Sequence, residues 1–149
     1  MKKFLLLGLC LLSFSAQALD KTCLIHIEKL EKELKNCTVQ YEDNATTADL
    51  NNASYDSADC AINIGHELIN TYYTKSKKES LKRFDGFVEQ IYDYAHHLNQ
   101  ESDYASQYYT GTIHNSIAIS EAEEMIKNLV KRYLKQLKSE CEDATDYKP

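Results

Sequence analysis

The sequence LKRFDGFVEQIYDYAHHL, residues 81–98, has the clearest helical pattern in the chain. Its apolar residues recur at alternating steps of three and four positions, which places them on one face of an α-helix. These residues are Leu81, Phe84, Val88, Ile91, Ala95 and Leu98. A helix with one apolar face must bury that face against other elements. The pattern therefore predicts a core helix of a helical bundle.

The segments before and after this stretch have patterns of the same kind. From residue 19 to residue 148 there is no proline, and there are only three glycines, so few residues interrupt a helix. The apolar patterns predict four helices: residues 20–41, residues 48–75, a third that starts at residue 76, and a fourth after Gly111.

Short polar side chains indicate where these helices begin, because they accept hydrogen bonds from the free amides of a first turn. The caps expected for the second, third and fourth helices are Thr46 or Thr47, Ser76, and Ser116 or Ser120. Ser120 and Glu123 also match the spacing of a capping box. The sequence leaves open whether the third helix breaks near Asn99 or continues.

Four cysteines follow residue 18: Cys23, Cys37, Cys60 and Cys141. They allow three connectivities of two disulfides. In an antiparallel up-down bundle, the end of the fourth helix meets the start of the first, which favours Cys23 with Cys141 and leaves Cys37 with Cys60. We therefore expect an all-α fold: an antiparallel bundle of about four helices, braced by disulfides, forming one domain over residues 19–149.

The first eighteen residues, MKKFLLLGLCLLSFSAQA, have the composition of a secretory signal peptide. Lys2 and Lys3 precede an apolar core, and residues 16–18 form a small-x-small cleavage site. The apolar core is too short for a membrane span, so we expect export without membrane attachment after cleavage. A periplasmic or secreted location also suits the cysteines, because disulfides form in oxidising compartments.

Removal of the signal segment leaves 15 basic residues against 23 acidic ones, a formal charge of −8. Nucleic acids and anionic membranes bind clustered Lys and Arg, so the acidic excess argues against both as partners. It favours a basic protein partner, although the same charge also keeps an exported domain soluble.

The sequence completes no catalytic or metal-binding motif. HELIN, residues 66–70, begins like the HExxH helix of zinc proteases, but Asn70 stands where the second histidine is needed. Asp93, His97 and Glu101 share one helical face, for which solvated charge is the simpler interpretation. We expect no enzymatic activity, no cofactor and no metal. A small metal-dependent activity around Asp93, His97 and Glu101 is the lowest-ranked alternative.

The segment DYASQYYTGTIHNSIAI, residues 103–119, contains three of the eleven tyrosines and the last glycine of the chain. Tyrosine suits protein interfaces because it buries a large area and keeps a polar tip. We therefore expect a partner-binding surface in this segment. Its expected contact residues are Tyr104, Tyr108, Tyr109, Thr110, Gly111, Thr112 and His114.

Two stretches resemble motifs of one protein family. YDSADCAIN, residues 55–63, resembles a signature of tyrosine, two residues, Ala-Asp, two residues and Leu-Asn, with Ile62 for leucine. ASQYYTGTI, residues 105–113, resembles an Ala-Ser-x-Tyr-x-Gly-Gly-Ser-Ile turn, with Thr110 for the first glycine. The family is that of the LprI-like lysozyme inhibitors, small exported helical proteins, and the similarity spans roughly residues 46–137. The resemblance implies a periplasmic protein that binds and blocks a lysozyme.

From this resemblance we expect an exported binding protein that inhibits a lysozyme-type cell-wall hydrolase by occlusion, and the acidic charge of the chain suits a basic enzyme. An immunity protein that neutralises a peptidoglycan-degrading amidase toxin of a competitor is the alternative. Both functions need the same compartment, fold and charge.

Overall fold

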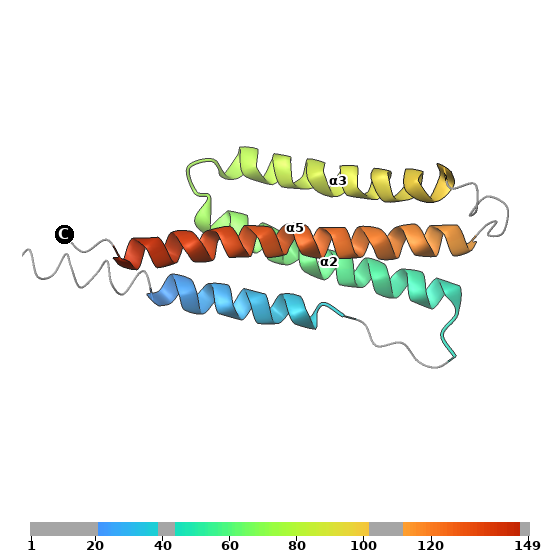
Figure 1. Ribbon diagram of the computed structural model, residues 1–149, viewed down its shortest axis with the longest axis horizontal. Helices are drawn as coiled ribbons and strands as arrows, with labels where there is room; N and C mark the ends of the chain where they lie inside the picture. Colours follow the sequence, from blue (N-terminus) through green and yellow to red (C-terminus); the bar gives the residue numbers. More distant parts are fainter. Residues whose placement is uncertain (1–20, 39–43, 102–111, 147–149) are drawn as a thin grey trace, which may run out of the picture.

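The computed structural model describes residues 21–38, 44–101 and 112–146, of which residues 99–101, 112–115 and 144–146 are described by their backbone alone. Four helices account for nearly all of these residues. They are the N-terminal helix (residues 21–36), α2 (Thr47–Tyr72), α3 (Lys77–Glu101) and α5 (Thr112–Asp146). Successive helices run in opposite directions (Figure 1). The expected all-α antiparallel bundle of four helices is confirmed.

The central pair of the bundle is α2 and α5, which start at the same end, while α3 and the N-terminal helix flank them (Figure 1). α2 packs more extensively against α5 than against α3. Small buried residues of α2 permit this close approach, because they leave room for the side chains of α5. They are Ala53, Ser54, Ser57, Ala58 and Ala61.

All four helices contribute to one hydrophobic core. Its largest fully buried side chains are Phe84, Ile27, Leu30, Leu68, Ile69, Ile126, Leu134 and Val130. Each such side chain contributes about 1.5–3 kcal/mol when it leaves water. Phe84 packs directly on the backbone of α2, since a Cβ at Gly65 would lie 2.3 Å from the Phe84 Cζ. Gly65 is therefore required where α3 crosses α2.

The apolar face of α3 is buried in the middle of the helix and exposed at its C-terminal end. Phe84, Val88 and Ala95 are buried, whereas Leu98 is 45% exposed. α3 is a flanking helix that packs against α2 and α5 on one side, so only part of its surface is covered. The helix also passes Asn99 without a break and ends at Glu101.

The start of α2 agrees with the sequence. Thr46 is its N-cap, and the Thr46 hydroxyl accepts a hydrogen bond of 3.3 Å from the Asp49 amide. The Asp49 carboxylate in turn accepts one of 2.9 Å from the Thr46 amide, which completes a capping box. α3 begins at Lys77, directly after the expected cap Ser76.

The expected start of the fourth helix is wrong. α5 begins at Thr112, so Ser116, Ser120 and Glu123 lie inside the helix and cannot form its N-terminal caps. Ala118 and Ile119 are buried and extend the apolar face toward the N-terminus, and this packing outweighs the local capping signals. The N-terminal helix is also shorter than expected, since it ends at residue 36 and not at residue 41.

Two disulfides join the helices, in the pairs that the bundle geometry favours. Cys23 pairs with Cys141 at a Cα–Cα distance of 6.3 Å, and Cys37 pairs with Cys60 at 5.6 Å. The N-terminal helix is thus tied to α5 at its start and to α2 just beyond its end. Each bridge is worth about 2–5 kcal/mol, and such bridges are typical of oxidising compartments. In the described part of the chain, no helix has the length and apolar character to cross a membrane.

Candidate functional site

The partner-binding surface expected from the sequence falls mainly outside the described residues. This applies to Tyr104, Tyr108, Tyr109, Thr110 and Gly111. Thr112 and His114 lie in the first turn of α5, where only the backbone is described. α3 ends and α5 begins at the end of the bundle where α2 begins (Figure 1).

A surface hollow of about 590 Å³ lies between the N-terminal helix and α2. Three carboxylates, two amides, one disulfide cysteine and one isoleucine line it: Glu33, Asp56, Asp59, Asn36, Asn63, Cys60 and Ile64. Among the described residues, no lysine or arginine lines this acidic hollow. Asp56 and Asp59 are exposed to solvent, so their negative charge is accessible to a partner.

The Cys37–Cys60 disulfide positions the two walls of the acidic hollow. Glu33 and Asp56 each lie one helical turn before a cysteine of this bridge, and Asn36 and Asp59 directly precede those cysteines. The Ser57 hydroxyl reinforces the junction, because it shares its one proton between the backbone carbonyl of Cys37 and the Glu123 carboxylate. A covalent and a hydrogen-bonded link therefore hold the carboxylates of two helices together.

The same serine connects the acidic hollow to α5. The Ser57 Oγ lies 2.7 Å from the Glu123 Oε1, which also accepts a hydrogen bond of 2.7 Å from the Lys127 Nζ. Burial alone raises the pKa of Glu123, but hydrogen bonds from Lys127 and Ser57 and the charge of Lys127 hold it below its usual value. Glu123 is therefore ionised at neutral pH and links α2 to α5.

A pair of tyrosines borders the acidic hollow. Tyr55 of α2 is 42% exposed, and its ring centroid lies 6.2 Å from that of Tyr92 on α3. Burial raises the pKa of Tyr92, and the negative charge of Asp59 raises it further. An exposed aromatic ring beside carboxylates is a favourable surface for Arg and Lys side chains, because both groups attract cations.

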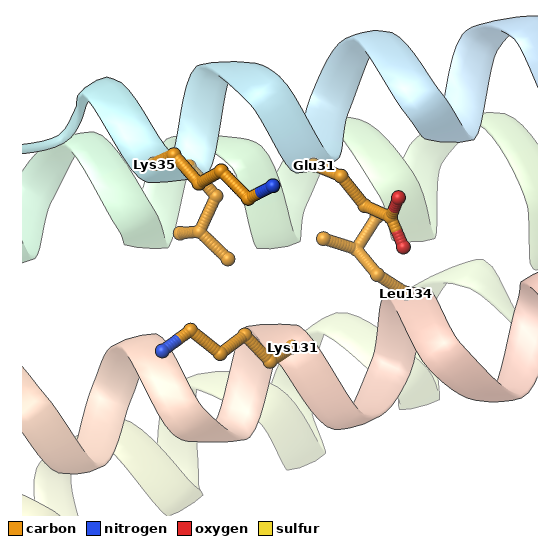
Figure 2. Close-up of a pocket in the computed structure, with 5 residues that line it drawn as sticks. Glu31, Lys35, Lys131 and Leu134 are labelled. Atoms are coloured by element: carbon orange, nitrogen blue, oxygen red, sulfur yellow. The ribbon is translucent and has the colours of Figure 1, made fainter.

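A second hollow, of about 230 Å³, lies on the opposite side of the N-terminal helix, against α5. Leu34 and Leu134 are buried beneath it, and Glu31, Lys35 and Lys131 form its rim. We call it the lysine hollow. Figure 2 shows that Lys35 extends toward Glu31, whereas Lys131 extends the other way along α5. The two ammonium groups do not converge, so they do not form one anion-binding point.

Two histidines have structural contacts: His66, the first residue of the HELIN stretch, and His26 of the N-terminal helix. The Nε2 of His66 lies 2.7 Å from an Asp85 carboxylate oxygen, and its ring packs edge-on against Phe84. His26 lies 2.9 Å from the Tyr72 hydroxyl and 3.1 Å from Glu67, and so links the N-terminal helix to the end of α2. Within the residues the structure describes, no three His, Cys, Asp or Glu side chains are grouped to hold a metal ion.

Comparisons with protein-family models, with curated proteins and with solved structures found no match to this chain. Function is therefore inferred from the residues and their geometry. The acidic hollow was missed by the sequence reasoning, which looked for a surface in the tyrosine-rich segment. A signal for it existed: Asp56 and Asp59 share a helix face, and the Cys37–Cys60 pairing brings Glu33 to that face.

Proposed function

We propose that the protein is an exported binding protein that inhibits a basic cell-wall hydrolase of the lysozyme type by occlusion. The acidic hollow is the docking surface for the enzyme. Inhibition needs no chemistry from the protein, because a bound partner that covers the catalytic cleft excludes the polysaccharide.

The acidic hollow is the observation that carries this proposal. Its three carboxylates come from two helices that a disulfide holds together, so they are presented without a large ordering cost. Complementary charge accelerates association and selects basic partners over acidic ones. Tyr55 adds an exposed aromatic side chain at the border of the hollow, and tyrosine is common among residues that dominate binding energy.

The tyrosine-rich segment is proposed as a second part of the contact. The end of α3 and the start of α5, between which this segment lies in the sequence, are at the end of the bundle where α2 starts (Figure 1). Asp56 and Asp59 lie in the first half of α2. An enzyme that covers the acidic hollow and this end of the bundle is proposed to contact Tyr108 and Tyr109 as well. Replacing both tyrosines by alanine is expected to weaken binding by about 2 kcal/mol if they are anchors.

The disulfides support the proposed location, since two bridges in a small domain are typical of exported proteins. A cell-wall hydrolase acts in the same compartment. An amidase toxin would act there too, and it would meet the same acidic surface. The identity of the inhibited enzyme therefore separates an inhibitor of lysozymes from an immunity protein.

The test is an inhibition assay with the mature, disulfide-bonded chain, residues 19–149. Purified basic lysozymes and peptidoglycan amidases are mixed with increasing amounts of the protein, and hydrolysis of purified peptidoglycan is followed. We expect one class of enzyme to lose its activity near a stoichiometric ratio. If every lysozyme and amidase keeps its activity at a tenfold excess of the protein, the proposed function is wrong.

A further inference from the structure

A second line of apolar residues runs along α3, beside the face that packs into the core. Its residues are Phe87, Ile91, Tyr94 and Leu98, and they recur at steps of four, three and four positions. This is the spacing of a seam between two paired helices. Phe87 is 41%, Tyr94 57% and Leu98 45% exposed, while Ile91 is half-buried. We call these four residues the outer apolar line.

The outer apolar line concentrates the exposed apolar surface of the described residues. Three of their seven large exposed apolar side chains lie on it. Single exposed apolar residues are normal on a protein surface, whereas a row of neighbouring ones marks a contact surface. Tyrosine is common among the residues that dominate binding energy, and Tyr94 is the most exposed residue of the line. The outer apolar line is therefore suited to pack against another helix.

The charges of α3 are divided along its length. Residues 77–83 contain four basic residues and one acidic residue, whereas residues 84–101 contain four acidic residues and no lysine or arginine. This order opposes the helix dipole, which favours cations near the C-terminus, and the last turn of α3 has no basic residue. A helix with the same order of charges, packed antiparallel to α3, places its basic end beside the acidic end of α3.

Opposite charges also lie at the two ends of the outer apolar line. Arg83 lies one helical turn before Phe87, is exposed, and takes part in no ion pair among the described residues. Position 101, about one turn after Leu98, is a glutamate, and the backbone of α3 continues through it. The order along the helix is therefore basic, apolar and acidic, and this order complements its own reverse.

We propose that the protein forms an antiparallel homodimer through the outer apolar lines of two α3 helices. A two-fold axis at the middle of the line sets Phe87 of one copy against Leu98 of the other. The same axis sets Ile91 against Tyr94. Because a two-fold axis makes every contact twice, all four residues of the line are covered in both copies.

The charged ends favour a second copy over a basic hydrolase as the occupant. The axis brings Arg83 of each copy beside position 101 of the other, so opposite charges meet at both ends of the interface. A basic enzyme lacks this match, since the line is bounded by one charge of each sign. The line is small compared with the roughly 800 Å² that each partner contributes to a stable complex. We therefore expect a reversible dimer with a dissociation constant in the micromolar range.

The dimer leaves the acidic hollow open. α3 and the N-terminal helix flank the central pair of helices (Figure 1), and the acidic hollow lies between the N-terminal helix and α2. One dimer therefore presents two acidic hollows. Dimer formation needs no hydrolase, so it is independent of the proposed function.

The test is sedimentation velocity of the mature, disulfide-bonded chain over a series of concentrations through the micromolar range. We expect the sedimentation coefficient to rise from the monomer value to the dimer value. Tyr94→Glu should raise the dissociation constant at least tenfold, whereas Ile25→Glu, at an exposed apolar residue of the N-terminal helix, should leave it unchanged. A parent that stays monomeric throughout, or a Tyr94→Glu variant that dimerises like the parent, overturns the proposal.

Exchange of the end charges tests the antiparallel arrangement. Arg83→Glu and Glu101→Arg should each raise the dissociation constant about tenfold, because like charges then meet twice in every dimer. The double variant restores opposite charges and should recover the dissociation constant of the parent. If the double variant dimerises no better than the single variants, the two α3 helices do not pair in this way and the proposal is wrong.

The outcomes also separate the dimer from the proposed function. If Tyr94→Glu is monomeric and still inhibits a hydrolase, the dimer is correct and inhibition does not depend on it. If the parent dimerises as expected and no hydrolase is inhibited, the dimer is correct and the proposed function is wrong. If the parent is monomeric and Tyr94→Glu loses inhibition, the outer apolar line contacts the hydrolase and the dimer is wrong.

Discussion

The N-terminal helix lies between two hollows of opposite character. On its α2 side, the acidic hollow is lined by Glu33, Asp56 and Asp59. On its α5 side, the lysine hollow has Lys35 and Lys131 at its rim. The charge of the two hollows differs because of the neighbouring helix: α2 contains no lysine or arginine, whereas residues 127–138 of α5 contain five. The formal net charge of −6 is therefore distributed unevenly, over regions of opposite sign that suit different partners.

The largest expected effects concern the disulfides that tie the N-terminal helix to its two neighbours. The bridges close loops of different length, with sequence separations of 118 for Cys23–Cys141 and 23 for Cys37–Cys60. In the chain-entropy description, removal of the first costs ~5 kcal/mol and removal of the second ~3 kcal/mol. Paired substitutions of each bridge by alanine, measured by urea unfolding, check these values.

The losses of binding affinity should follow the opposite order to the losses of stability, because the Cys37–Cys60 bridge borders the acidic hollow. Cys37→Ala with Cys60→Ala is expected to weaken binding of the basic enzyme. Cys23→Ala with Cys141→Ala should leave binding nearly unchanged at temperatures where the protein stays folded. If the more destabilised variant is also the weaker binder, the acidic hollow has no special part in recognition.

Charge reversal in the acidic hollow has the next largest expected effect. Asp56→Lys with Asp59→Lys should lower the affinity for the inhibited enzyme at least ~100-fold, roughly 3 kcal/mol, because like charges then meet. Titration calorimetry measures the change. Asp93→Lys with Glu124→Lys changes the net charge equally at exposed positions on α3 and α5 and should have little effect.

Charge reversal in the lysine hollow is the matching experiment on the other side of the N-terminal helix. Lys35→Glu with Lys131→Glu is expected to leave the affinity unchanged or to raise it slightly. A loss as large as that of the Asp56 and Asp59 variant would show that both sides of the N-terminal helix contact the enzyme, and the distinction between the two hollows would fail.

A smaller effect is expected at Glu123, which links the acidic hollow to α5 through Ser57. Its lowered pKa means that the folded state favours the ionised form, so this stabilisation is present above the unfolded value of 4.5 and is lost as the pH falls through the folded pKa. Glu123→Gln should lower the unfolding free energy by about 1–2 kcal/mol at pH 7. The difference between variant and parent should shrink below pH 4.5; a difference independent of pH would exclude an ionised Glu123.

The smallest expected effect is on the ionisation of Tyr92. Burial and then Asp59 raise its pKa above the ordinary value of 10.0. Asp59→Asn should lower this pKa toward 10.0, since it removes a nearby negative charge, while Asp93→Asn should not change it. Absorbance titration, compared with a Tyr92→Phe variant to identify the signal, gives the answer. An unchanged Tyr92 pKa in Asp59→Asn would mean that the tyrosine pair does not border the acidic hollow.

The sequence was sufficient to predict the helices, because the spacing of their apolar residues is a short-range pattern. Apolar spacing identified the core face of α3, of which Phe84, Val88 and Ala95 are buried. The positions of the cysteines on the helices, together with an up-down order, were enough to favour the two bridges. The first inference used residues that are close in sequence, and the second used the positions of cysteines near the ends of the predicted helices.

Other features depend on contacts between distant parts of the chain. The start of α5 was misplaced because Ser120 is a good local cap, while burial of Ala118 and Ile119 continues the helix through it. The acidic hollow was missed because Glu33 and Asp56 are far apart in sequence and meet only once the N-terminal helix packs against α2. The expected contacts around Tyr108 lie outside the described residues and stay a prediction.

The central claim is that a basic cell-wall hydrolase docks on the acidic hollow, and carboxyl labelling of the complex tests it most directly. A carbodiimide couples an amine to exposed carboxylates, and mass spectrometry measures the extent at each site with and without the bound enzyme. We predict that labelling of Asp56 and Asp59 falls sharply in the complex, while labelling of Asp93 and Glu124 is unchanged. A complex that forms and inhibits the enzyme while Asp56 and Asp59 stay fully labelled would contradict the claim.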